Sequence, residues 1–96
     1  MRICEIIGNV TLARVHPALA GLRLLVAAPF NAADLQAGRP ASGEELVVAD
    51  ELGAGVGSRV GASEGREAAM PFRPERKPVD AYCACILDHV QLTPNP

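Results

Sequence analysis

The sequence has few aromatic residues and no tryptophan. Among its 96 residues only Phe30, Phe72 and Tyr82 carry aromatic rings, although hydrophobic residues make up 49% of the chain. Sixteen of those hydrophobic residues are alanine, so bulky side chains for a core are scarce. A domain of this length buries only about 60–65% of the surface that its unfolded chain exposes. We therefore expect one domain spanning 1–96 that buries further apolar surface against copies of itself.

A long basic stretch and a long apolar stretch are also missing. The formal net charge is −2, and the densest basic group, at 73–77, is interrupted by Pro74 and Glu75. Nucleic-acid binding requires positive charge that neutralises phosphates, so we expect no nucleic-acid partner. The longest strongly apolar segment, LRLLVAAPF at 22–30, is far shorter than the ~20 residues of a membrane-spanning helix. We therefore expect no membrane partner.

No secretory signal is recognisable at the N-terminus. The segment MRICEIIGNV is interrupted by Glu5, Gly8 and Asn9, which a signal peptide's apolar region would not contain. The chain has three cysteines, and an odd number without an export signal is typical of a reducing compartment. We expect a cytoplasmic protein.

Glycine and proline divide the chain into short apolar runs, most of which are too short for helices. We expect strands at 2–15, 22–29, 44–50, 58–63 and 79–90. Gly8 should bend the first strand, and the last strand, which is apolar on both faces, should be buried on both sides.

The remaining segments are expected to hold one short helix. It is placed at 64–70, while 31–43 is expected as a loop and 71–78 as an extended, proline-stiffened connection. Five short strands and one short helix predict a mainly all-β fold, a small five-stranded barrel of the OB-like kind.

The glycine-rich stretch at 49–65 could suggest a phosphate-binding loop. A dinucleotide fingerprint would need a glycine where Ser58 stands, and a P-loop would need a lysine, but none occurs before Lys77. No long helix follows to receive a phosphate at its N-terminus. The alternatives left are a turn with positive φ angles and a close approach of backbones where loops of several subunits meet. For Asp50 and Glu51, a solvated or backbone-capping role is favoured over cation binding.

Cys83, Cys85 and His89 have the same parity on the last expected strand, so they are expected to line one face. A C-x-C pair with a distant histidine resembles part of a zinc site, but it lacks the paired C-x₂-C spacing of such sites. We expect core cysteines, with a small cysteine/histidine metal-binding protein kept as an alternative. No nearby Ser/His/Asp pattern suggests a nucleophile, so we expect no enzyme, no cofactor and no metal.

Three short blocks of residues follow one another along the chain, and their order and spacing carry a resemblance to a known family. An opening strand, an L-x-G turn and a second strand are formed by Met1, Ile3, Ile6, Gly8, Val10, Leu19, Gly21, Leu24 and Leu25. The glycine block contributes Asp50, Gly53, Ala54, Gly55, Gly57 and Val60. The closing strand contributes Pro78, Val79, Asp80, Ala81, Ala84, Ile86, Asp88 and Val90. Together these blocks resemble the EutN/CcmL family, the pentameric vertex proteins of bacterial microcompartments and carboxysomes.

The chain departs from this family pattern at a few positions. Arg23 stands where the family often has lysine, and Gly61 replaces a bulky residue of the fourth strand. Arg66 and Glu67 interrupt the family's G-S-x-A-R motif, and Cys83 occupies a position that is usually β-branched.

The resemblance implies a small β-barrel that forms cyclic homopentamers at the five-fold vertices of an icosahedral shell. Its partners would be the hexameric and trimeric shell proteins, its place the microcompartment shell, and its role structural, without catalysis. We expect the subunit interface or central pore to include Asp50, Gly53, Ala54, Gly55, Val56 and Gly57. The alternative from another class is an OB-like ligand-binding module, which would need exposed aromatic and basic residues on the barrel.

Overall fold

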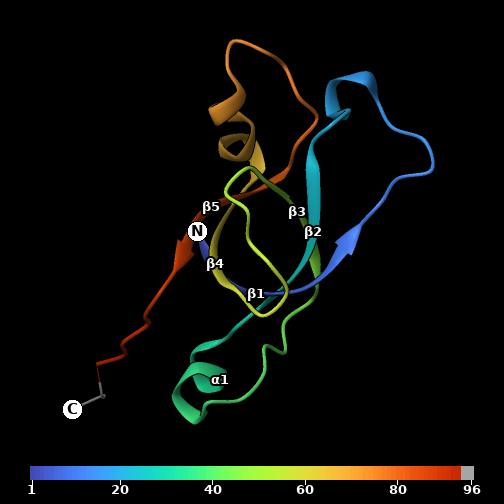
Figure 1. The fold of residues 1–96 in the computed structure, drawn as a ribbon. Coiled ribbons are helices and arrows are strands. Elements are labelled where there is room, and N and C mark those ends of the chain that lie inside the picture. The colour runs from blue at the N-terminus through green and yellow to red at the C-terminus, as the bar shows by residue number, and fades with distance from the viewer. Residues whose placement is uncertain (94–96) are drawn as a thin grey trace.

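The computed structural model describes residues 1–93, and its centre is a closed barrel of five strands (Figure 1). The strands are β1 (Arg2–Val10), β2 (Arg23–Pro29), β3 (Leu46–Asp50), β4 (Arg59–Glu64) and β5 (Ala81–Leu87), arranged around the barrel in the order β1-β2-β3-β5-β4. Neighbouring strands are antiparallel, except that β3 and β5 are parallel and pair at one position, Ala49 with Tyr82. The expected five-stranded all-β barrel is confirmed.

β1 pairs with β2 along one side and with β4 along the other, and its pairing with β4 closes the barrel. Its register against β2 shifts between Ile6 and Gly8, which confirms the bend expected there. The strand ends at Val10, whereas we expected it to reach Val15. Residues 11–22 instead form a loop with one 3₁₀ turn, η1 (Pro17–Leu19), where the His16 Nδ1 accepts a hydrogen bond from the Ala18 N–H at 3.0 Å.

A short α-helix lies where a plain loop was expected. α1 (Ala32–Ala37) begins with a reciprocal cap: the Asp34 N–H donates to Asn31 Oδ1 at 2.7 Å, and the Asn31 N–H donates to Asp34 Oδ2 at 3.2 Å. Gly38, with φ of 67°, ends the helix in the left-handed region. The pair of caps stabilises a helix of six residues that is too short to show a clear apolar periodicity.

The one helix that we expected, at 64–70, is a 3₁₀ helix and is longer than expected. η2 (Gly65–Phe72) continues through Pro71, in the segment for which we expected an extended connection. Proline disfavours the α region for the residue before it, but its own fixed φ is compatible with a short run of 3₁₀ turns. Among residues 1–93, no helix is long and apolar enough to cross a membrane.

β5 is shorter than expected and is not buried on both faces. It spans Ala81–Leu87 instead of 79–90, and Ala84 and Ile86 are exposed in the isolated chain. Its register against β4 shifts so that Gly61 pairs with Cys85 and Ala62 with Cys83, which leaves Ala84 as an extra residue. A Cβ added at Gly61 would lie 2.7 Å from Cys85 Sγ and 2.8 Å from Met1 Sδ. These two sulfur atoms occupy the space that a side chain at position 61 would need.

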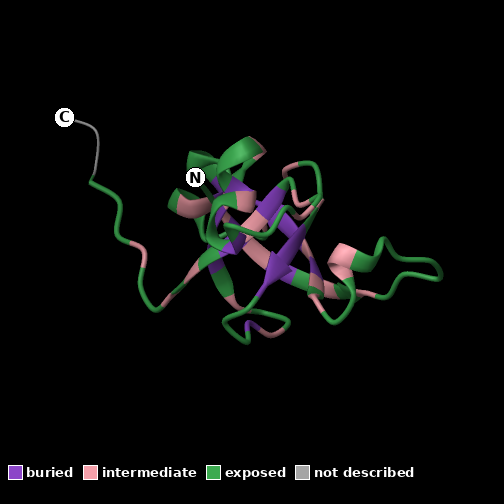
Figure 2. Cartoon of the chain, turned by 90° about the horizontal axis from the view of Figure 1, so that it is seen from above, coloured by how far each residue is buried: buried purple, intermediate pink, exposed green. Residues whose placement is uncertain are grey.

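The core inside the barrel is small, as Figure 2 shows by the buried segments at its centre. Its buried members are mostly small side chains: Cys4, Ile6, Leu25, Ala27, Val48, Ala54, Val60, Ala62, Ala81 and Cys83. Leu25 and Ile6 are the largest fully buried side chains. The isolated chain thus has few large apolar side chains in its core, as its alanine content predicts.

Leu25→Ala tests this account of the core. Because Leu25 is fully buried, we expect the free energy of unfolding to fall by about 2–5 kcal/mol. Leu12→Ala removes the same atoms from a side chain that is 42% exposed, and should cost about 0.5 kcal/mol. Urea unfolding at one fixed protein concentration measures both, and equal losses would contradict the account.

Candidate functional site

The glycine loop, residues 51–58, connects β3 to β4 and is organised by the carboxylate that precedes it. The side chain of Asp50 is fully buried. Its Oδ1 accepts a hydrogen bond from the Leu52 N–H at 3.1 Å, and its Oδ2 accepts from the N–H groups of Gly53 and Ala54, each at 3.0 Å. Three successive amides therefore converge on one carboxylate, which confirms the expected capping role of Asp50.

Arg23 completes this arrangement from the neighbouring strand. The β2–β3 register places Arg23 opposite Asp50, and the Arg23 Nη1 lies 2.7 Å from Asp50 Oδ2. The same nitrogen also donates to the carbonyl oxygen of Ala54. One guanidinium thus neutralises the buried carboxylate and joins both ends of the turn 50–54.

The pKa of Asp50 lies below its ordinary value. Burial by itself raises this pKa, because it disfavours the charged form. The hydrogen bonds from the Leu52 and Ala54 N–H groups and from Arg23 act in the opposite direction and outweigh it. Asp50 is therefore charged at neutral pH, which is the form that holds the loop.

The second half of the loop is fixed on β1. The Ser58 Oγ accepts from the Gly55 N–H at 3.1 Å, and the Ser58 N–H donates to the Gly55 carbonyl at 3.0 Å. The Gly57 N–H donates to the Ile6 carbonyl at 2.8 Å, and the Ile6 N–H donates to the Ser58 carbonyl at 2.9 Å. Gly53 and Gly57 have φ angles of 86° and 93°, so both turns of the loop require glycine.

The residues predicted as a subunit contact divide into two groups. Asp50 and Ala54 point into the chain, where Ala54 is part of the core. Gly53 and Gly57 are exposed, Gly55 is half-buried, and Val56 is 68% exposed. A Cβ added at Gly55 would meet no atom within 4 Å in this chain. The loop thus presents a surface that its own subunit leaves open.

Sequence reasoning missed three residues of this site, Arg23, Leu52 and Ser58. Arg23 is distant in sequence, and only the pairing of β2 with β3 brings it to Asp50. Leu52 belongs to the same loop as Val56, is 49% exposed and adds to the apolar surface of the loop. A serine three residues after Gly55 is a common turn signal and could have indicated the Ser58 bond.

The expectation that Cys83, Cys85 and His89 share one face is wrong. The extra residue Ala84 shifts the strand by one position, so Cys83 is fully buried in the core while Cys85 is half-buried over Gly61. Burial, together with the nearby charge of Asp50, raises the pKa of the Cys83 thiol to about 12, so that it is protonated at neutral pH. Within residues 1–93 no group of three His, Cys, Asp or Glu side chains is arranged to hold a metal ion.

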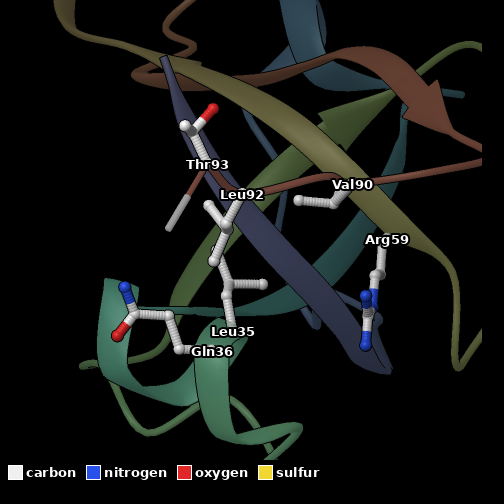
Figure 3. Close-up of a pocket in the computed structure, with 6 residues that line it drawn as sticks. All are labelled: Leu35, Gln36, Arg59, Val90, Leu92 and Thr93. Atoms are coloured by element: carbon white, nitrogen blue, oxygen red, sulfur yellow. The ribbon is translucent and has the colours of Figure 1, made fainter. Parts of the chain in front are cut away.

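A pocket of about 380 Å³ lies between α1 and the segment after β5 (Figure 3). It is lined by Leu35, Gln36, Arg59, Val90, Leu92 and Thr93. Apolar and polar side chains contribute to the lining equally, and its one charged group, Arg59, lies 5.2 Å from the centre of the Phe30 ring. These side chains include neither a carboxylate nor a nucleophile that points to a reaction.

The aromatic side chains do not form a ligand-binding face on the barrel. Phe72 is buried and contacts the half-buried Tyr82 edge-to-face, with 5.4 Å between ring centres. Phe30 is half-buried beneath Arg59. The OB-like binding module required exposed rings for stacking, and none of the three rings is exposed.

Comparison with known proteins places this barrel among shell proteins. The family described as "Ethanolamine utilisation protein EutN/carboxysome" matches residues 1–88. The bacterial microcompartment shell vertex protein PduN of Salmonella typhimurium is 32% identical over 88 residues, which cover 92% of this chain and 96% of PduN. The carboxysome shell vertex protein CcmL of Gloeobacter violaceus is 31% identical over 96 residues, which cover 100% of this chain and 91% of CcmL.

Solved structures agree with the sequence matches. The structure of Gloeobacter violaceus CcmL has a TM-score of 0.83 with 30% identity, covering 96% of this chain and 90% of that one. The GrpN pentameric microcompartment shell protein of Rhodospirillum rubrum has a TM-score of 0.79 with 29% identity, covering 96% of this chain and 100% of GrpN. The likeness therefore extends over almost the whole chain in both sequence and fold.

Asp50→Asn tests the role of the buried carboxylate. We expect the free energy of unfolding to fall by about 2–4 kcal/mol at pH 7, because Arg23 and three amides lose a charged partner. The folded pKa of Asp50 is depressed, so its stabilisation is complete above the ordinary value of 3.8 and is lost as the pH falls through the folded pKa. The difference in the free energy of unfolding between wild type and variant, measured by urea unfolding, should therefore shrink as the pH decreases. Asp88→Asn, at an exposed position, is the control, and equal effects of both variants at every pH would contradict this role.

Proposed function

This chain belongs to the EutN/CcmL family, and we propose that it is a structural shell protein whose pentamers cap the five-fold vertices of a bacterial microcompartment. The observation that carries this function is the likeness to shell vertex proteins and to a pentameric shell protein over nearly the full length of the chain. A layer tiled only by hexagons is flat, so a closed shell needs five-fold positions. The chain acts by occupying them, and we propose that it has no catalytic role.

The exposed apolar surface of the single chain supports assembly into a ring. Among residues 1–93, ten large hydrophobic side chains are at least 39% exposed: Met1, Ile7, Leu12, Val15, Val47, Leu52, Val56, Met70, Ile86 and Leu92. A cyclic ring joins two different surfaces of each subunit and closes on itself, so it can cover some of these side chains on every copy. Permanent interfaces are large and apolar, which suits a chain with so small a core of its own.

Within this ring, we place the glycine loop at the contact between subunits or at the five-fold axis. Leu52 and Val56 give it an apolar surface, and Gly55 leaves room for a neighbouring backbone. Asp50 and Ala54 hold the loop from inside the subunit. The loop is thus a fixed shape presented outward, which is what a repeated contact between identical subunits requires.

A pentamer at a vertex must also contact the neighbouring proteins of the shell. We propose that the outer rim of the ring contacts the hexameric and trimeric shell proteins of the facets, since the five-fold position is bounded by facets on all sides. This places the protein in the shell of the microcompartment.

Native mass spectrometry of the purified chain at micromolar concentration tests the assembly. We expect a species of five times the monomer mass to dominate. A single population of monomers or dimers would contradict the function proposed here.

Gly55→Val tests the place of the glycine loop in the ring. A Cβ added at position 55 meets no atom within 4 Å in the same chain, so the subunit should fold with unchanged circular dichroism. At a subunit contact the valine side chain would clash with the neighbour. We therefore expect the protein concentration below which the pentamer dissociates to be roughly tenfold or more higher than for the wild type. Gly55→Ala adds one methyl group and should give a smaller shift. A valine variant that assembles as stably as the wild type would place the loop away from the contact.

A further inference from the structure

η2 and the turn that follows it lie outside the barrel, at the end opposite to α1 (Figure 1). Their side chains form a basic hollow there. It has a volume of about 1010 Å³ and is formed by η2 and the turn that follows it. Its lining residues are Arg66, Ala69, Met70, Arg73, Pro74, Glu75, Arg76 and Lys77. No residue of the glycine loop belongs to this lining, so the hollow is a separate surface.

The arginines of the hollow have no carboxylate partner among the described residues. Of the nine Lys and Arg side chains in the sequence, Arg2, Arg23, Arg39 and Lys77 form ion pairs. Three of the other five, Arg66, Arg73 and Arg76, line this one hollow and are exposed. Positive charge is therefore concentrated here on a chain whose net charge is −2.

The segment that carries these arginines is fixed to the barrel. The Lys77 Nζ donates to the Ala18 carbonyl at 2.7 Å, lies 3.4 Å from Glu75 Oε2, and is 5.6 Å from the centre of the Phe72 ring. Phe72 in turn packs edge-to-face on Tyr82 of β5. The hollow is thus presented on a supported surface, which lowers the entropic cost of binding a partner.

We propose that the basic hollow binds an acidic segment of a partner protein, whose carboxylates pair with Arg66, Arg73 and Arg76. A guanidinium presents two parallel N–H groups, which match a carboxylate. Met70, 49% exposed within the same lining, gives an apolar side chain of that segment a place to pack. The partner segment should therefore combine Glu or Asp pairs with an apolar residue.

The charge of the whole chain favours an acidic protein segment over a nucleic acid or an anionic membrane. Residues 65–77 carry four basic and two acidic side chains, which leaves a net charge of −4 for the rest of the chain. An extended polyanion would meet that negative remainder, whereas a short acidic segment contacts only the hollow. Glu75 at the hollow forms an ion pair with Lys77 and therefore repels an incoming carboxylate less than an unpaired glutamate would.

Fluorescence anisotropy with the full-length chain tests this proposal. The probe is a labelled short peptide in which two Glu-Glu pairs flank a leucine, and the same peptide with Gln for Glu is its control. We expect binding of the acidic peptide alone, weakening as the ionic strength rises from low to physiological values. Simultaneous Arg66→Gln, Arg73→Gln and Arg76→Gln should weaken binding roughly tenfold or more. The matched control changes Arg2, Arg14 and Arg39 to Gln, which alters the net charge equally and should have little effect.

Several results would overturn the proposal. Equal weakening by both triple variants would show attraction to the overall charge instead of to the hollow. Absence of peptide binding, or tighter binding of single-stranded DNA or phosphatidylserine vesicles, would exclude an acidic protein segment as the preferred partner. If the triple variant of the hollow no longer assembles in native mass spectrometry, these arginines belong to a subunit contact. Retained assembly with lost peptide binding separates this inference from the proposed function.

Discussion

The ion-paired carboxylate of Asp50 is the interaction on which the candidate site depends. It joins the end of β3 to three amides of the glycine loop and, through Arg23, to β2. A carboxylate buried without such partners would be strongly destabilising, so the loop geometry and the charge require each other. Gly53, whose φ is positive, then permits the backbone conformation that brings those amides together.

The small core explains why a subunit of this kind serves as part of a ring. Alanine and cysteine side chains fill much of the barrel interior, while ten large apolar side chains among residues 1–93 are exposed. Hydrophobic stabilisation is proportional to the apolar area removed from water, and a neighbouring subunit can supply area that the barrel cannot. Association therefore contributes to the stability of the chain as well as to the shape of the shell.

The sequence allows much of the fold to be predicted but less of the site. The short apolar runs between glycines and prolines located the five strands, and Gly8 located the bend in β1. The helix α1 was missed because its signal lies in one capping pair, Asn31 and Asp34, rather than in periodicity. The parity argument for Cys83 and Cys85 failed because the extra residue in β5 could not be read from the chain. Such pairings depend on strand register, which only tertiary structure sets.

The most direct measurement is an experimental structure of the assembled protein. The central claim is that the glycine loop, held from within by Asp50, forms part of the contact between subunits of a vertex pentamer. The account predicts a cyclic ring of five barrels in which Leu52 and Val56 of each subunit are covered by a neighbour. A ring of five with this loop in solvent, or an assembly without five-fold symmetry, would contradict it.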